Sequence, residues 1–279
     1  KPSPVPCAKL FTFTKRSKTL ASLSVSMPMP VYLVIAVAAL VSFVSCNNDT
    51  DLDHKSIFPD GVDKTTQNEF DLWVDAYNEL MGRDFLRQYS PRMIQLIGSA
   101  EYKEDSSEVL GTAEGGMKIF LNKVNLLDLK KPDMSVIRFY YIKTMYHEFG
   151  HILQQTKNYS TDLNTISTDY QGPSRVNVGD YENGRDTEAL EMGFISAYAS
   201  SEPGEDFVEI LSFYVVYGKE YWERMLTLVG EDGAEKMLRK YALIKNYLKT
   251  KWEIDIEKLE QIVQRRMEEV PDLELTALD

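Results

Sequence analysis

The stretch YHEFGHILQQ, residues 146–155, holds two of the three histidines in this 279-residue chain. They are His147 and His151, four positions apart, with Glu148 directly after the first. The stretch forms the second half of residues 135–155, which have helical periodicity and are apolar on nearly every face. A helix that is apolar all round is a buried one. The pattern therefore predicts a central, buried helix that carries both histidines.

The spacing of the two histidines predicts a zinc site. Residues at i and i+4 of a helix lie on one face, so His147 and His151 can direct two imidazoles at one point, as the HExxH motif does. Glu148 lies about 100° around the helix from His147, where a carboxylate serves as general base toward a water at the metal. Surface or hydrogen-bonded histidines are the alternative. With three histidines in the chain, chance produces HExxH in roughly one such chain in several hundred.

A hydrolytic zinc site needs a third protein ligand and leaves its fourth position to water. His54 lies in a polar segment, and the motif does not continue as HExxHxxGxxH, so we expect a carboxylate on a later helix. The candidates are Glu188, Glu191, Glu202, Glu205 and Glu209. Two of them, in EDFVE, are four residues apart and face the same way on a predicted helix.

The segments YHEFGH and SAYASSEPGEDFVE together resemble the HExxH and YxxxxxxExxxE pattern of lethal-factor-type gluzincins. The resemblance implies a zincin-like fold and one Zn²⁺ held by His147, His151 and Glu205. It also implies that Glu209 supports a ligand histidine from outside the ligand set, and that Tyr198 contacts the oxyanion.

Two of these assignments have alternatives. Glu191 is the other candidate for the third ligand, because it lies nearer to the HExxH motif at a spacing that other gluzincins use. Tyr198 is one of 16 tyrosines and could instead be a core residue.

The first 46 residues contain five basic and no acidic side chains, and then the apolar run VYLVIAVAALVSFVS, residues 31–45. This run is short for a membrane span and suits the apolar region of a secretory signal. Ser45 followed by Cys46 resembles the lipobox of bacterial lipoproteins, although Phe43 replaces the usual leucine. We expect a signal peptide whose Cys46 is lipidated; an uncleaved anchor or a plain signal peptide is the alternative.

Together with the lipobox, the mature chain resembles the putative zinc-binding metallopeptidase lipoproteins of Bacteroidetes, which are called substrate import-associated zinc metallohydrolases. That resemblance implies an outer-membrane lipoprotein exposed at the cell surface. It also implies a peptide or protein substrate and components of an outer-membrane importer as partners.

The charge of the chain excludes one class of partner. The whole chain has 31 basic and 43 acidic residues; removal of five basic residues with positions 1–46 leaves 26 against 43, or −17. Such a domain is repelled by phosphates, and no basic cluster with interleaved aromatics occurs, so nucleic-acid binding is excluded.

The rest of the chain predicts an α+β domain over residues 65–279, after a polar tether at 47–64. We expect a helix over 65–89, strands within 93–102 and 106–124, and a long loop over 156–185. Helices are expected over 186–199 and 204–217 and through most of the remainder to residue 269. The expected fold thus combines a small mixed sheet, a buried active-site helix and a mostly helical C-terminal half.

The site supports three functions. The first is a zinc metallopeptidase, the second a non-catalytic zinc-containing component of an importer, and the third a metallohydrolase acting on another bond. Glu148 favours an enzyme, because a structural zinc site gains nothing from a carboxylate directed at water.

Overall fold

The computed structural model describes residues 72–270 apart from 104–106, 115–117, 128–132, 182, 183 and 185. The expected signal peptide with Cys46, the tether with His54 and the C-terminal residues 271–279 lie outside the described residues. None of the helices in the described part is both long enough and apolar enough to span a bilayer.

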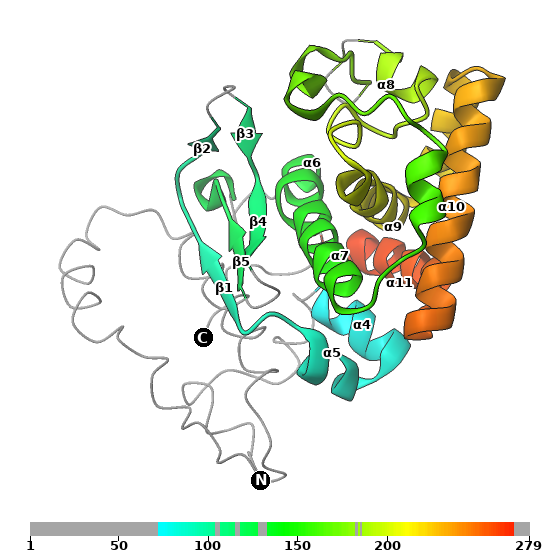
Figure 1. The fold of residues 1–279 in the computed structure, drawn as a ribbon. Coiled ribbons are helices and arrows are strands. Elements are labelled where there is room, and N and C mark those ends of the chain that lie inside the picture. Colours follow the sequence, from blue (N-terminus) through cyan, green and yellow to red (C-terminus); the bar gives the residue numbers. More distant parts are fainter. Residues whose placement is uncertain are drawn as a thin grey trace, which may run out of the picture.

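A small mixed sheet forms one side of the fold (Figure 1). Its strand order is β1 (Met93–Leu96), β5 (Lys118–Leu121) and β4 (Gly111–Glu114). β1 is parallel to β5, and β4 is antiparallel to it. A separate hairpin pairs β2 (Glu101–Tyr102) with β3 (Glu108–Val109). Alternate residues of β5 are buried, so one face of the sheet packs on the core.

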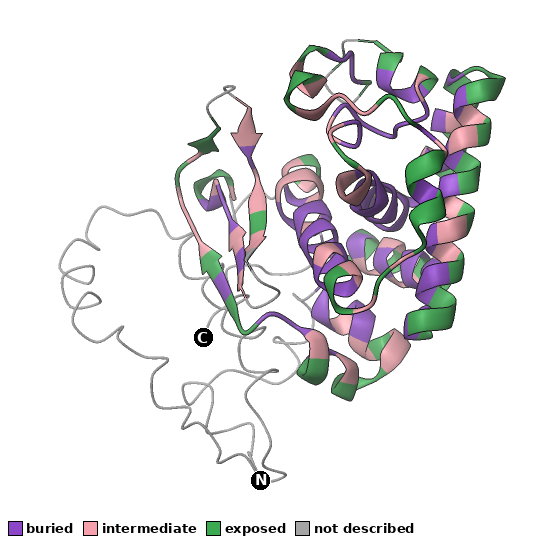
Figure 2. Ribbon diagram, viewed as in Figure 1, coloured by how far each residue is buried: buried purple, intermediate pink, exposed green. Residues whose placement is uncertain are grey.

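The predicted central helix lies beside this sheet (Figure 1). It begins with α6 (Met134–Val136), continues through the π-helical η4 (Ile137–Lys143) and ends with α7 (Thr144–Thr156). Most residues of α7 are buried (Figure 2), because the sheet covers one side of the helix and α9 the other. Burial of the helix predicted over 135–155 is confirmed only in part: residues 144–150, 152 and 153 are buried, whereas most residues from 135 to 142 are half-buried or exposed.

Three long helices form most of the C-terminal half. They are α9 (Pro203–Leu228), α10 (Glu231–Trp252) and α11 (Ile256–Glu269). α9 is interrupted by a kink at Gly218, where φ is 85° and ψ is 169°. α9 packs on α7 with very little space between them: a Cβ added at Gly150 of α7 would lie 2.9 Å from Val208 Cγ1 and 3.1 Å from Leu211 Cδ2. Glycine at this position therefore lets the two helices approach closely. The predicted α+β class with a small mixed sheet is confirmed.

The structure corrects two predicted helices. Within the described part of residues 65–89, α4 (Val74–Met81) and α5 (Arg83–Tyr89) are separated at Gly82, where φ is 80° and ψ is 159°. Glycine adopts this conformation without the steric cost that other residues pay, so the chain turns there.

The helix predicted over 186–199 is wrong, because only α8 (Glu188–Glu191) is helical. The following backbone is bound by side chains instead: Asp180 accepts a hydrogen bond from the Ala197 N–H, and Ser196 Oγ accepts one from the Ala199 N–H. Side chains that bond to nearby backbone in this way compete with helical hydrogen bonds.

The long loop between α7 and α8 contains two short 3₁₀ turns, η5 (Thr161–Thr165) and η6 (Gly172–Asn177).

Candidate metal centre

Three donors from two helices converge on one point. His147 and His151 lie on α7, and Glu205 lies in the first turn of α9. Glu205 Oε2 is 3.1 Å from His147 Nε2 and 3.2 Å from His151 Nε2, and the two Nε2 atoms are 3.2 Å apart. The donor atoms of all three residues lie within 4.8 Å of one another, so this group could hold a metal ion.

The surroundings of the imidazoles fit a cation at this point. His147 Nδ1 is 2.8 Å from Glu209 Oε1, so its N–H donates to that carboxylate and its Nε2 keeps a lone pair for a metal. The Gln154 amide lies 2.6 Å from His151 Nδ1, and its buried Oε1 has no partner among the described residues. A half-turn of the amide lets Oε1 accept from the Nδ1–H, which leaves the Nε2 lone pair of His151 free for the same metal.

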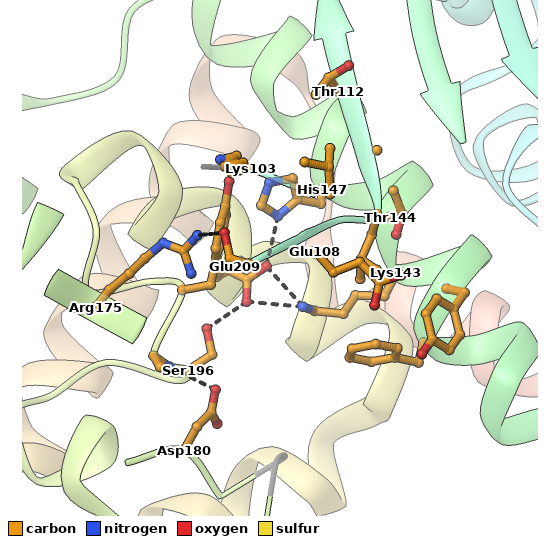
Figure 3. A pocket seen from close by; sticks show the side chains of 18 of the residues that line it. Lys103, Glu108, Thr112, Lys143, Thr144, His147, Arg175, Asp180, Ser196 and Glu209 are labelled. Carbon is orange, nitrogen blue, oxygen red and sulfur yellow. Dashed lines mark hydrogen bonds and ion pairs between the residues drawn. The ribbon is translucent and has the colours of Figure 1, made fainter. Parts of the chain in front are cut away.

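Glu209 is the centre of a buried polar network (Figure 3). Besides His147, its carboxylate accepts from Lys143 Nζ, at 3.0 Å to each oxygen, and from Ser196 Oγ at 2.6 Å. Lys143 ends the π-helical segment η4, and Ser196 belongs to the turns after α8. Glu209 on α9 thus contacts the central helix at His147 and Lys143, and the turns after α8 at Ser196.

These contacts shift the pKa values of the acidic groups. Burial raises the pKa of Glu209, but the charges of Lys143 and His147 and the Ser196 hydrogen bond outweigh burial and lower it to about 2. Burial likewise raises the pKa of Glu205, whereas its bonds to both histidines hold it well below the ordinary value. Both carboxylates are therefore ionised at neutral pH, as a metal site requires.

The pKa of His147 shows how strongly negative this environment is without a metal. Burial lowers the pKa of the imidazole, but the hydrogen bonds with Glu205 and Glu209 raise it to about 10. Two carboxylates thus stabilise positive charge at this imidazole.

Glu148 lies between the ligand cluster and the sheet. Its side chain is buried, and burial raises the pKa of its carboxyl above the ordinary value although His147 and His151 counteract the shift. The carboxylate accepts a hydrogen bond from the backbone of Ala113 in β4. A buried carboxyl with a raised pKa next to a metal site has the properties of a general base.

Tyr198 lines the same pocket as His147 and Glu148. Its hydroxyl is 3.3 Å from Glu205 Oε1, and its ring centroid is 5.7 Å from that of His147. Burial raises the pKa of the phenol, so the hydroxyl keeps its proton and can donate a hydrogen bond.

The remaining carboxylates that were candidate ligands have other positions. Glu191 is exposed and accepts from Thr187 Oγ1 at 2.8 Å. Glu188 Oε2 accepts the Gly179 N–H at 2.8 Å. Glu202 is exposed at the N-cap of α9. None of the three joins the metal-ligand group, whereas Glu205 does.

Sequence reasoning missed the residues that hold this group in place. Lys143, Ser196 and Gln154 contact the ligands or Glu209, yet none stands in a motif. Asp206, next to the candidate ligand Glu205, is fully buried with Lys240, at 2.7 Å between Oδ2 and Nζ. The one available signal was Lys143 itself, a charged residue four positions before His147 on an otherwise apolar helix face.

We expect Glu209→Gln to weaken zinc binding by about 10–100-fold, since partners of a ligand histidine typically contribute that much. The variant also breaks the ion pair with Lys143, whose side chain is only 10% exposed. Breaking a buried ion pair by removal of one charge costs about 3–5 kcal/mol, so the melting temperature should fall as well.

Lys143→Met in the Glu209→Gln background separates the two effects. It should recover much of the lost stability, measured by thermal unfolding, and leave zinc affinity low in a competition titration. Recovery of full zinc affinity in the double variant would show that Glu209 acts on stability alone.

Comparisons with known proteins agree with this geometry. A family model described as "Putative zinc-binding metallo-peptidase" matches residues 62–257. The chain is also similar to the protein in a crystal structure of "a putative zinc-binding metallo-peptidase from Bacteroides caccae ATCC 43185". The two share 34% sequence identity over 77% of this chain and 78% of that one, with a TM-score of 0.61. No curated protein matches the chain.

Proposed function

The chain belongs to the family described as "Putative zinc-binding metallo-peptidase", and on this premise we propose that it hydrolyses peptide bonds at a zinc ion held by His147, His151 and Glu205. The observation that carries the proposal is the position of Glu148, beside the ligand cluster and bonded to β4. When bound, zinc supplies Lewis acidity that activates water and polarises a carbonyl.

The protein's own residues have distinct roles in this proposal. Glu148 takes the proton of the attacking water and passes it to the leaving amine. The Tyr198 hydroxyl, which keeps its proton, donates to the oxyanion that develops on the substrate carbonyl. Glu209, with Lys143, fixes the orientation and tautomer of His147.

The strand β4 offers a place for the substrate backbone. Within the described residues it is the edge of its sheet, and it pairs with β5 alone. Gly111 and Thr112 of β4 line a pocket of about 640 Å³ together with His147, Glu148 and Tyr198. An extended peptide that pairs with an exposed edge gains main-chain hydrogen bonds. Such pairing would place a peptide carbonyl beside Glu148.

The test is metal content combined with digestion of a mixed peptide library. We expect about one zinc per chain, peptide cleavage by the zinc-loaded protein, loss of cleavage with a chelator and its return with added zinc. A protein that holds zinc in full and cleaves none of the peptides would instead be a non-catalytic zinc-containing component.

We also propose that the domain is held on a membrane by a lipid on Cys46. The proposal rests on the sequence pattern of residues 31–46 alone. Cys46→Ser should release the protein into the soluble fraction or leave an unprocessed precursor, as detected by fractionation and mass spectrometry of the N-terminus. Correct processing and continued membrane association of the Ser variant would rule out lipidation at this cysteine.

A further inference from the structure

The pocket beside the metal-ligand cluster has two cationic side chains that the proposed mechanism does not use. They are Lys103, which follows β2, and Arg175 in η6. Both line the same pocket as His147, and Figure 3 labels both among the residues that line it. They come from different walls, one from the β2–β3 hairpin and the other from the long loop between α7 and α8.

Both cations lie against the ring of Tyr198. The guanidinium carbon of Arg175 is 4.5 Å from the ring centroid, and Lys103 Nζ is 5.7 Å from it. The hydroxyl of the same tyrosine is 3.3 Å from Glu205 Oε1. The Tyr198 ring thus separates both cations from Glu205, a candidate zinc ligand. A bound peptide can span this distance.

The carboxylates of this pocket already have partners. Glu108 forms an ion pair with Lys123, and Glu209 forms one with Lys143. Asp180 accepts the Ala197 N–H, and the carboxylate of Glu148 accepts from Ala113. These acidic groups are thus held by residues other than Lys103 and Arg175.

The two cations have no such partner. Neither forms an ion pair with a carboxylate in the described part of the chain; the Arg175 guanidinium lies over the Tyr198 ring and donates a hydrogen bond of 3.1 Å to Ser107 Oγ. A guanidinium has five N–H donors in a planar fork that matches a carboxylate, so four donors of Arg175 remain for a ligand.

We propose that Arg175 and Lys103 form a subsite for a carboxylate of the substrate, so that the pocket selects peptides with an acidic side chain or a free C-terminal carboxylate near the cleaved bond. The inference rests on the proposed peptidase function and adds a substrate class to it. Charge-assisted, bidentate bonds to Arg in a partly enclosed pocket provide the necessary discrimination. The alternative is that Arg175 only connects the two walls of the pocket through Ser107.

The experiment measures binding, so it does not depend on turnover. The probes are alanine-based pentapeptides with Glu or Gln at each position in turn, each made with a free or an amidated C-terminus. Their dissociation constants are measured on the zinc-loaded Glu148→Gln protein, and their kcat/KM on the zinc-loaded protein with Glu148 intact. Comparison of Glu with Gln tests a side-chain carboxylate, and comparison of acid with amide tests a terminal one.

Arg175→Gln is the informative variant, because it removes the charge and keeps a polar amide side chain at this position. We expect about 10-fold or stronger preference for the carboxylate-bearing peptide in the parent protein, and loss of most of that preference in Arg175→Gln and part of it in Lys103→Gln. Arg224→Gln is the matched control: Arg224 is exposed and lies over another ring, 5.6 Å from the Tyr221 centroid, outside the pocket. It should leave the preference unchanged.

The possible outcomes separate the two proposals. Equal binding of Glu and Gln peptides and of acids and amides would overturn the subsite, even if the protein cleaves peptides. Equal weakening of all peptides by Arg175→Gln would assign Arg175 to the wall contact and would also overturn it. Arg175-dependent binding of carboxylates without any cleavage would support the subsite and refute the peptidase function.

Discussion

Glu148→Gln is expected to lower peptide hydrolysis by about 10²–10⁴-fold, the usual contribution of a general base, while zinc stays bound. Glutamine has nearly the same shape as glutamate and can still accept from Ala113 through its amide oxygen, so the contact with β4 persists. It cannot take the proton of the attacking water. Zinc content by atomic emission and kcat/KM on a cleaved library peptide are the two measurements.

A buried glutamate elsewhere provides the matched control. Glu260 on α11 is 9% exposed and accepts the Lys219 backbone N–H at 3.0 Å through Oε1. Glu260→Gln makes the same chemical change in a similar environment, outside the pocket, and should leave hydrolysis within about twofold of the parent, as a substitution outside the site does. Activity of Glu148→Gln close to that of the parent would remove Glu148 from the mechanism and require another base.

Glu205→Ala is expected to abolish tight zinc binding. The substitution leaves two protein ligands on α7, and we expect zinc affinity to fall by more than about 100-fold, beyond the loss seen for residues outside the ligand set. Activity should fall with the metal and return only in part at high zinc concentration. A competition titration with a chromogenic chelator measures the affinity directly.

Two further glutamates give the comparison. Glu202 is exposed and lies three residues before Glu205, and Glu202→Ala removes its carboxylate. Glu191→Ala removes the alternative ligand on α8. Both variants should bind zinc as the parent does, because neither carboxylate belongs to the ligand group. Loss of zinc in Glu191→Ala, with zinc retained in Glu205→Ala, would move the third ligand to α8. The proposed role of Tyr198 would then lose its basis, because it depends on the spacing to Glu205.

The part of the site that lies on helices could be predicted because its spacing has a physical meaning. Residues four apart share a helix face, and this rule predicted one face for His147 and His151 and another for Glu205 and Glu209. The all-round apolar pattern of residues 135–155 predicted a buried helix, which holds for most of α7 but not for most of residues 135–142. The order of the elements, with strands before helices, predicted the fold class.

The remainder depends on contacts between distant residues, which periodicity does not report. The helix expected over 186–199 fails in part because Asp180 accepts the Ala197 N–H across 17 residues, a contact that exists only in the folded chain. Arg175 could not be placed in the pocket from sequence, since its loop has no period. The ion pair of Lys143 with Glu209 joins residues 66 positions apart, so it could not be predicted from the sequence either.

The close contact of α7 and α9 at Gly150 also bears on the order in which the three donors come together as the chain folds. His147 and His151 leave the ribosome together, and the pair can form as soon as its helix does. Glu205 follows His151 by 54 residues and comes beside it only after α9 has docked on the glycine. Two histidines alone would hold zinc weakly, so the proposed site would bind the ion firmly only once the second helix has docked.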